Sequence, residues 1–297
     1  MGKIHKALEK IKANKDDIID RNQNPDKKDF DSGLAVEGIE DIEEIEEIEE
    51  NIPEEKESEK VFSRIDNVAE ILVTVNKPHS VESEQFRLLK NSILFPDSGK
   101  PPKTIMVTSS DKGEGKSFVA SNLAVSIAAS IDEYVLLLDS DLRDPSVHNI
   151  FGIENSKGLS SYLSGESDLP SVFVKTFLKK LTLVPAGPSP LNPSELISSE
   201  QMKRLIDELR SRYDDRYIII DSPPPYMTSE ANALATYVDG VIIVVKQGHT
   251  KKERLKDILD IYGKDKILGV VKNFATGMFG SGYGYDKRYN YGKNKKK

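Results

Sequence analysis

The sequence predicts an α/β protein whose core is a doubly wound, mostly parallel sheet. Three observations predict it: short, nearly continuous apolar runs, helical patterns that alternate with them, and a glycine-containing loop that joins one run directly to a helix. Runs that are apolar at almost every position are typical of parallel strands buried on both faces, and strands alternating with helices form doubly wound sheets. The apolar runs are residues 104–110, 134–141, 181–187, 217–224, 240–246 and 267–273.

Helical patterns lie between several of these runs. Residues 116–130, KSFVASNLAVSIAAS, follow the glycine-containing loop, and residues 199–213, SEQMKRLIDELRSRY, precede the fourth run. Both segments are long enough for a helix that crosses one face of a sheet. We therefore expect one folded domain over residues 76–274.

The N-terminal part of the chain has a different composition. Ile4, Leu8 and Ile11 recur at helical spacing, with lysines on the other face, so residues 1–15 are predicted to form a short basic amphipathic helix. Such a helix either contacts an anionic membrane or a partner, or is a marginal solvated helix, since it is very short. The pattern leaves both readings open.

Residues 16–75 are expected to be a mostly disordered acidic linker. Isoleucines occur at every third position from Ile39 to Ile48 in a background of glutamates. A period of three drifts around a helix and forms no stable apolar stripe, and like charges oppose compaction.

The overall composition excludes several classes of protein. The 297 residues include 42 basic and 49 acidic ones, for a net charge of −7, which argues against general nucleic-acid binding. With no cysteine, neither a disulfide framework nor a cysteine zinc site is available, and the four histidines are scattered singly. No apolar run approaches the roughly 20 residues of a membrane-spanning helix, and the N-terminus lacks the pattern of a signal peptide. We therefore expect a cytoplasmic protein that reaches a membrane only through a partner or a surface helix.

The segment DKGEGKS, residues 111–117, predicts a phosphate-binding loop. It lies between a strand and a helix, as a P-loop requires. Gly113 and Gly115 permit the tight turn that points backbone N–H groups at a phosphate. Lys116 is placed to reach the β- and γ-phosphates, and the Ser117 hydroxyl is placed to bind Mg²⁺. The loop deviates from GxxxxGK[ST] because Ser110 replaces the first glycine.

Three carboxylates follow two of the predicted strands. Asp139 and Asp141 end the second run, and Asp221 ends the fourth. The carboxyl ends of parallel strands are where open α/β sheets bind ligands. Residues two apart in a strand face the same side, so both aspartates of the first pair are expected there. Together with the loop, they suit Mg²⁺ coordination and proton transfer from a nucleophile.

These landmarks resemble the bacterial tyrosine kinases of capsule and exopolysaccharide synthesis, which are P-loop NTPases of the MinD/ParA-like superfamily. The resemblance covers about residues 80–291. It is carried by TSSDKGEGKS (108–117), LLLDSDLRDPSVH (136–148), AGPSPLNPSEL (186–196), IIIDSPPP (218–225), VDGVIIVV (238–245) and the tyrosine cluster near the C-terminus.

The resemblance implies roles for particular residues and a need for ATP and Mg²⁺. The implied nucleotide-binding residues are Gly113, Glu114, Gly115, Lys116, Ser117, Phe118 and Asn273. The implied metal ligands are Ser117, Asp141 and Asp221. The implied catalytic residues are Lys116, Asp139, Asp141, Asp221 and Arg143, with Asp139 as the base for the incoming tyrosine.

Residues 275–297 are expected to form a flexible tail that serves as substrate. The tail holds Tyr283, Tyr285, Tyr289 and Tyr291 among glycines, an asparagine and lysines, which cannot bury an aromatic ring. In the resembled family such tyrosines are the phosphoacceptors. Four phosphates would add roughly −6 to −8 charges, against the six basic residues between Asp286 and Lys297. The alternative is a low-complexity tail that only aids solubility or binds RNA.

The resemblance also implies partners. The family's subunit-contact motif ExxRxxR appears as Glu84, Arg87 and Lys90, which predicts a ring-like homo-oligomer. Lysine in the last position cannot form the bidentate pair of arginine, so a weaker assembly is expected, and an ordinary helical charge ladder is the alternative reading. The family further implies a membrane-embedded polysaccharide co-polymerase as activator, protein tyrosines as substrates, and control of polymer export.

Two other functions are compatible with a P-loop. A ParA/MinD-type positioning ATPase would carry a signature lysine five residues before Lys116, where this chain has Asp111. The lysine next to it, Lys112, stands where the kinase family usually has proline. A chain-length regulator that binds ATP without catalysis would not need the intact set of lysine and aspartates. The register of the loop and the tyrosine cluster favour the kinase.

Overall fold

A seven-stranded sheet forms the centre of the computed structural model, which describes residues 68–212 and 215–275. The strand order is β3-β4-β2-β5-β1-β6-β7, and every neighbouring pair is parallel except β3 and β4. The strands are β1 Thr104–Ser109, β2 Tyr134–Asp139, β3 Val174–Lys175, β4 Leu181–Val184, β5 Arg216–Asp221, β6 Gly240–Lys246 and β7 Ile267–Asn273. The predicted doubly wound fold and its six strands are confirmed. The seventh strand, β3, is only two residues long, too short to leave a pattern in the sequence.

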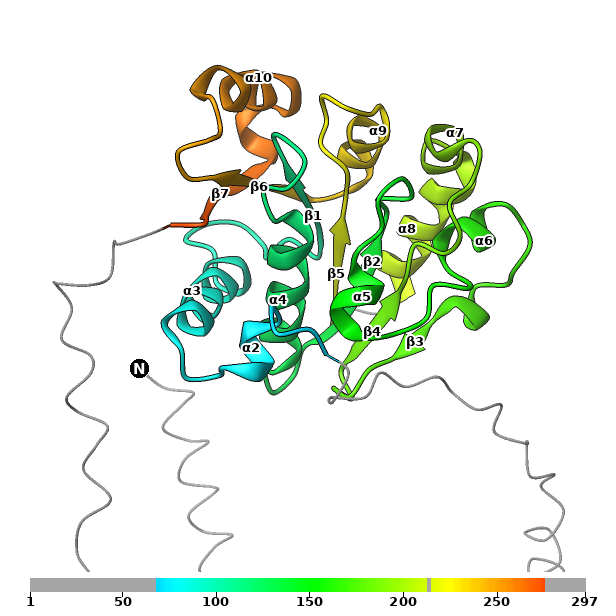
Figure 1. The fold of residues 1–297 in the computed structure, drawn as a ribbon, viewed down its shortest axis with the longest axis horizontal. Coiled ribbons are helices and arrows are strands. Elements are labelled where there is room, and N and C mark those ends of the chain that lie inside the picture. The colour runs from blue at the N-terminus through cyan, green and yellow to red at the C-terminus, as the bar shows by residue number, and fades with distance from the viewer. Residues whose placement is uncertain (1–67, 213–214, 276–297) are drawn as a thin grey trace, which may run out of the picture. The chain divides into compact units, whose positions relative to one another are not determined.

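Helices cover both faces of the sheet (Figure 1). On one face lie α2 Val73–Asn76, α3 Val81–Leu94, α4 Lys116–Ala128 and α5 Val147–Phe151. On the other lie α6 Leu159–Leu163, α7 Pro193–Ile197, α8 Glu200–Arg212, α9 Glu230–Tyr237 and α10 Lys252–Tyr262, with short 3-10 turns at Pro170–Val172 and Lys264–Lys266. Each face encloses its own apolar cluster, because side chains along each strand alternate between the two faces. Within the described ranges, no helix combines the length and the apolar character needed to cross a bilayer.

Helix α4 is the most deeply buried element of the first face. From Val119 to Ala128 its residues are all buried, because it packs on the sheet with one side and against α2 and α3 with the other. The ring of Phe118 meets that of Phe86 on α3 edge-to-face, with centroids 5.6 Å apart. A helix that is buried on nearly all sides is mostly apolar around its circumference. Because α4 packs against the sheet and two helices, its first turn is held in place.

The strand register places the predicted carboxylates at one edge of the sheet. Asp139 at the end of β2 is paired with Asp221 at the end of β5, and Asp221 is paired with Val107 on β1. The next residues of β1 lead into the phosphate loop. Because the strands are parallel, the three chain segments emerge together.

The folded unit begins earlier than the expected boundary at residue 76. Leu72 is fully buried in the core, and the backbone N–H of Ala69 donates to Ile150 O at 3.0 Å. The Asn122 side chain on α4 accepts hydrogen bonds from the backbone and the hydroxyl of Thr74, both at 3.0 Å. Residues 68–75 therefore belong to the domain and not to the linker. The predicted N-terminal helix and most of the predicted linker lie outside the described residues.

Replacing Asn122 with alanine is expected to destabilise the domain. Its amide also donates to Ile71 O at 3.1 Å and to Phe118 O at 2.9 Å, so removal of the side chain takes a hydrogen-bond partner from several partly buried backbone groups. Loss of about 2 kcal/mol would lower the Tm by roughly 4–8 °C, measured by calorimetry. Asn91→Ala, at an exposed position of α3, is the control, and equal Tm values for the two variants would contradict the role given to Asn122.

Candidate active site

Two glycines shape the loop between β1 and α4. Gly113 and Gly115 have φ angles of 79° and 92°, a region that other residues rarely adopt. A Cβ at Gly115 would also lie 2.1 Å from Nδ2 of Asn273. The conformation and the close approach both require glycine at this position. The strand–loop–helix context predicted for the phosphate loop is present.

The loop is held from inside by the Glu114 side chain. Its carboxylate accepts hydrogen bonds from Ser110 N at 2.7 Å, from Asp111 N at 3.0 Å and from the Ser110 hydroxyl at 2.9 Å. The Thr250 hydroxyl donates to the same carboxylate. Glu114 is only 3% exposed. Sequence reasoning treated Glu114 as one nucleotide-binding residue among several and missed these contacts, which involve a residue 136 positions away.

Lys116, the first residue of α4, lies between the predicted aspartates. Its Nζ is 2.8 Å from Oδ2 of Asp141 and 4.0 Å from Oδ2 of Asp221, and it donates to the Ser117 hydroxyl at 3.3 Å. Burial disfavours the charged ammonium, yet the carboxylates of Asp221, Asp141 and Asp139 outweigh it and raise the pKa of Lys116 above its ordinary value. The structure thus brings together five residues that the sequence analysis selected.

Asp221 is a fully buried carboxylate close to Lys116 and Ser117. Its exposure is 0%, its Oδ2 lies 4.0 Å from the Lys116 ammonium, and a hydrogen bond from the Ser117 side chain lowers its pKa. Burial is the largest influence on the group and raises the pKa of Asp221, while Lys116 acts in the opposite direction. Buried carboxylate oxygens beside Ser117 and Asp141 are the oxygen ligands that Mg²⁺ prefers. The donor set therefore fits a divalent cation.

Asp139 is also buried, and it accepts hydrogen bonds from the loop that follows β2. It accepts hydrogen bonds from Asp141 N at 3.2 Å and from Ser146 N and Val147 N, both at 3.1 Å. Burial, followed by the charge of Asp221, raises the pKa of Asp139, and the hydrogen bond from Val147 opposes this. Three donors leave one of the four acceptor positions of a carboxylate free.

Arg143 belongs to a different set of contacts. Its Nε donates to Glu230 Oε1 at 2.9 Å, and its guanidinium also donates to the Ser194 hydroxyl at 3.1 Å. Glu230 is 2% exposed, at the start of α9. This bridge joins the loop after β2 to α7 and α9, and sequence reasoning missed both partners. The catalytic role that the resemblance implies for Arg143 stays a prediction.

Two further predicted nucleotide-binding residues flank the loop. Asn273, at the end of β7, donates from Nδ2 to the Glu114 carbonyl at 3.0 Å. The Phe118 ring packs toward α3 instead of toward the loop. Contact of either residue with a nucleotide stays a prediction.

The residues predicted to join subunits lie on α3. Arg87 and Glu84 form an ion pair at 2.7 Å within the helix, and Arg87 also donates to Pro78 O. Lys90 follows on the same helix and is partly exposed. The four tyrosines of the predicted tail, Tyr283, Tyr285, Tyr289 and Tyr291, lie outside the described residues.

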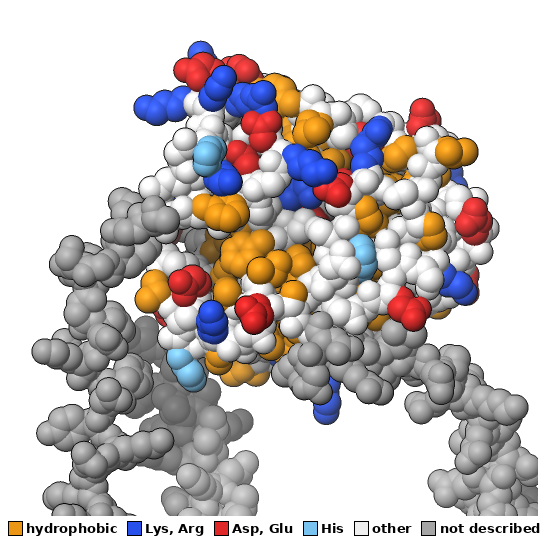
Figure 2. Space-filling view, viewed as in Figure 1, with side chains coloured by type: hydrophobic (Ala, Val, Ile, Leu, Met, Phe, Trp, Pro, Cys, Tyr) orange, Lys and Arg blue, Asp and Glu red, His pale blue; other side chains and the backbone are white. Residues whose placement is uncertain are grey.

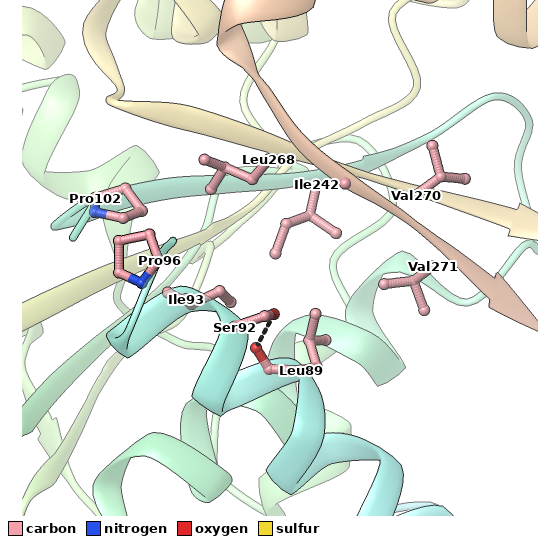
Figure 3. A pocket seen from close by; sticks show the side chains of 10 residues that line it. Leu89, Ser92, Ile93, Pro96, Pro102, Ile242, Leu268, Val270 and Val271 are labelled. Atoms are coloured by element: carbon pink, nitrogen blue, oxygen red, sulfur yellow. Dashed lines mark hydrogen bonds between the residues drawn. The ribbon is translucent and has the colours of Figure 1, made fainter. Parts of the chain in front are cut away.

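The molecule has a charged region at the carboxyl edge of the sheet and a separate apolar cavity. Figure 2 shows basic and acidic side chains gathered at the top of the view, over α10 and the neighbouring loops. A separate cavity of about 340 Å³ lies between α3 and the strands β6 and β7 (Figure 3). Its lining is apolar apart from Ser92, whose hydroxyl donates to Leu89 O. Such a lining offers no donors to phosphate groups, so the charged edge of the sheet is the candidate active site.

The glycine-shaped loop, the lysine at the start of α4 and the aspartates at neighbouring strand ends define a P-loop nucleotide-binding protein. Residues 102–265 match the family model described as an AAA domain. The tyrosine-protein kinase YwqD of Bacillus subtilis (strain 168) is 37% identical over 216 residues, which cover 72% of this chain and 90% of that protein. The tyrosine-protein kinase CpsD of Streptococcus agalactiae is 33% identical over 218 residues, which cover 72% of this chain and 91% of CpsD. This chain belongs to the bacterial tyrosine-protein kinases.

Solved structures agree with this membership. The kinase domain of Escherichia coli tyrosine kinase ETK superposes with a TM-score of 0.64 at 30% identity, covering 74% of this chain and 87% of that one. The chimerical protein CapA2B2 superposes with a TM-score of 0.62 at 35% identity, covering 69% of this chain and 89% of the chimera. The predicted family and enzyme class are confirmed, and the positioning-ATPase alternative is not favoured.

Replacing Asp221 with asparagine is expected to stabilise the nucleotide-free chain. An acid whose folded pKa is raised loses stability as the pH rises through that pKa, so wild type is penalised most in alkaline buffer. Asparagine removes the buried charge, and a gain of about 1–2 kcal/mol corresponds to roughly 3–6 °C in Tm. The gain should be largest near pH 8 and shrink toward about pH 5.

Differential scanning fluorimetry across that pH range measures the effect, without nucleotide or Mg²⁺. Asp207→Asn on the exposed side of α8 is the control. A variant that melts below wild type at every pH would show that the pairing with Lys116 outweighs burial.

Proposed function

We propose that this chain is an ATP- and Mg²⁺-dependent protein-tyrosine autokinase. The observation that carries the proposal is the position of Lys116, whose ammonium is 2.8 Å from Asp141 and 4.0 Å from Asp221 at the edge of the sheet where Asp139 also ends its strand. Relatives named tyrosine-protein kinases support the same chemistry. Phosphoryl transfer needs little covalent chemistry from a protein, so this positioning of charge is the main requirement.

The residues divide into those that bind and those that move a proton. The later N–H groups of the loop and the Lys116 ammonium bind the phosphates of ATP. Ser117, Asp141 and Asp221 would hold Mg²⁺, which would supply positive charge beside the phosphates. Lys116 exchanges part of its pairing with Asp141 for the β- and γ-phosphates.

The transfer step uses Asp139 as the base. The tyrosine hydroxyl oxygen attacks the γ-phosphorus, a new P–O bond forms, and the bond from the γ-phosphorus to the bridging oxygen breaks to release ADP. The hydroxyl proton passes to the acceptor position of Asp139 that its three backbone donors leave free. Because Asp139 is fully buried, the loop after β2 moves before a tyrosine reaches it.

The proposed acceptors are the four tyrosines of the C-terminal cluster on a neighbouring copy. About ten residues separate Asn273 from Tyr283, and a flexible segment of that length spans roughly 15–20 Å. Such a reach suits an adjacent subunit in a ring-like homo-oligomer whose contacts include Glu84, Arg87 and Lys90. Phosphorylation reverses the charge of the tail and loosens its docking at a carboxylate-lined site.

The proposed partner is a membrane-embedded activator that recruits the kinase to the inner face of the cytoplasmic membrane. The chain matches 31% of the length of the tyrosine-protein kinase wzc of Salmonella typhi, so in that relative the kinase region is joined to a much longer chain. The solved CapA2B2 protein is a chimera. In this chain, a separate membrane protein would take the place of the additional region of wzc. The proposed outcome is control of exopolysaccharide polymerisation and export.

Replacing Lys116 with methionine is expected to abolish autophosphorylation. Loss of one preorganised charge that stabilises the transferring group lowers the rate by about 100-fold or more. Anti-phosphotyrosine signal and intact mass measure the product, and circular dichroism confirms the fold. The control is Lys112→Met, which removes an exposed lysine of the same loop that pairs with Asp144 at 2.9 Å. Unchanged phosphotyrosine in the Lys116 variant would overturn the assignment of the site.

Transfer between subunits is expected in a mixture of two chains. One carries Lys116→Met and an intact tail, and the other is active but lacks residues 280–297. Phosphotyrosine on the inactive chain, resolved by mass, is the expected result, with the inactive chain alone as control. Its absence, with or without the membrane partner, would defeat transfer in trans. Light scattering after addition of ATP to wild type should show a smaller particle.

A further inference from the structure

We propose that Glu114 and Thr250 form a positioning pair that sets the shape of the phosphate loop before nucleotide binds. The inference rests on the proposed nucleotide site: it adds Thr250 and gives the already implied Glu114 a specific role in setting affinity. Neither side chain is assigned to contact the reacting atoms. Both act through the loop backbone.

The Glu114 carboxylate fixes the first turn of the loop. It accepts the N–H groups of Ser110 and Asp111, at 2.7 Å and 3.0 Å, together with the Ser110 hydroxyl. These two N–H groups are therefore unavailable to an anion, and phosphate binding falls to the N–H groups that follow and to the start of α4. Burying a carboxylate beside a phosphate site reduces stability. The four hydrogen bonds that Glu114 accepts, including the one from Thr250, offset this loss.

Thr250 ties this carboxylate to the end of β6. The hydroxyl oxygen of Thr250 accepts from Lys246 N at 2.9 Å, and Thr250 N donates to Lys246 O at 3.1 Å, which closes a tight turn. Since the oxygen accepts from the backbone, its own hydrogen is free to be donated, and Glu114 receives it. The hydroxyl thus has one donor and one acceptor, both fixed.

A third strand holds the same residue by its backbone. Asn273 at the end of β7 donates to the Glu114 carbonyl at 3.0 Å. The loop after β1 is therefore fastened to the ends of β6 and β7 through one residue. A loop already fixed in its binding shape loses less conformational entropy when ligand binds, so the network favours affinity for nucleotide.

The test compares Thr250→Val with Thr250→Ser in the full chain. Valine is nearly isosteric but cannot donate, whereas serine keeps the hydroxyl. We expect Thr250→Val to raise the Kd for ADP by calorimetry and the KM for ATP about tenfold, with kcat within about threefold of wild type. Thr250→Ser should match wild type. His249→Ala, at the exposed neighbouring position of the same turn, is the matched control.

A double-mutant cycle tests whether the two residues act together. Glu114→Gln and Thr250→Val should each weaken ADP binding, and the double variant should be little weaker than the worse single one, because both remove one network. Effects that multiply, or Kd values equal to that of wild type, would overturn the pair. A kcat loss without a change in Kd or KM would also overturn it.

These outcomes separate the inference from the proposed function. Nucleotide binding is measured without protein phosphorylation. If wild type binds ADP but never forms phosphotyrosine, the kinase proposal fails and the pair is still tested. If wild type is an active kinase and Thr250→Val binds ADP normally, the pair alone is wrong.

Discussion

The ammonium group of Lys116 offsets the repulsion among three buried aspartates at the carboxyl edge of the sheet. Asp139, Asp141 and Asp221 are all less than 5% exposed, and like charges at such burial repel strongly. The parallel register holds two of these carboxylates close together, since it pairs Asp139 directly with Asp221. Lys116 is held at this point because it is the first residue of a helix that the core fixes on several sides. A surface helix would allow the lysine to withdraw into solvent.

The site remains electrostatically incomplete even with this lysine. The Lys116 ammonium faces three carboxylates, and burial raises the pKa of Asp221 even with Lys116 and Ser117 beside it. Burial of an incompletely neutralised carboxylate reduces stability. Proteins keep such groups where a ligand supplies the missing charge. A cation and a nucleotide that bind only the folded chain would recover the stability lost in the free chain.

The loops around this edge are fastened by long-range polar contacts rather than by apolar packing. Glu114 joins the phosphate loop to the turn after β6, Arg143 joins the loop after β2 to Glu230 and Ser194, and Lys112 pairs with Asp144 across the two loops. Polar contacts of this kind fix geometry and can still be exchanged for a ligand at modest cost. The apolar clusters on each face supply the rigidity beneath them.

The sequence by itself determined the sheet, the phosphate loop and the three aspartates. Six of the seven strands are nearly continuous apolar runs, and Gly113, Gly115 and Lys116 lie within four consecutive positions between a strand and a helix. Such patterns are local, and the parallel arrangement then requires the strand ends to meet. Only the tertiary structure decided that residues 68–75 pack with the domain, where Leu72 is buried, and which distant residues, Thr250 and Glu230, pair with Glu114 and Arg143. Those partners are 136 and 87 positions away, and no periodicity or spacing in a chain records which distant side chain will complete a buried hydrogen bond.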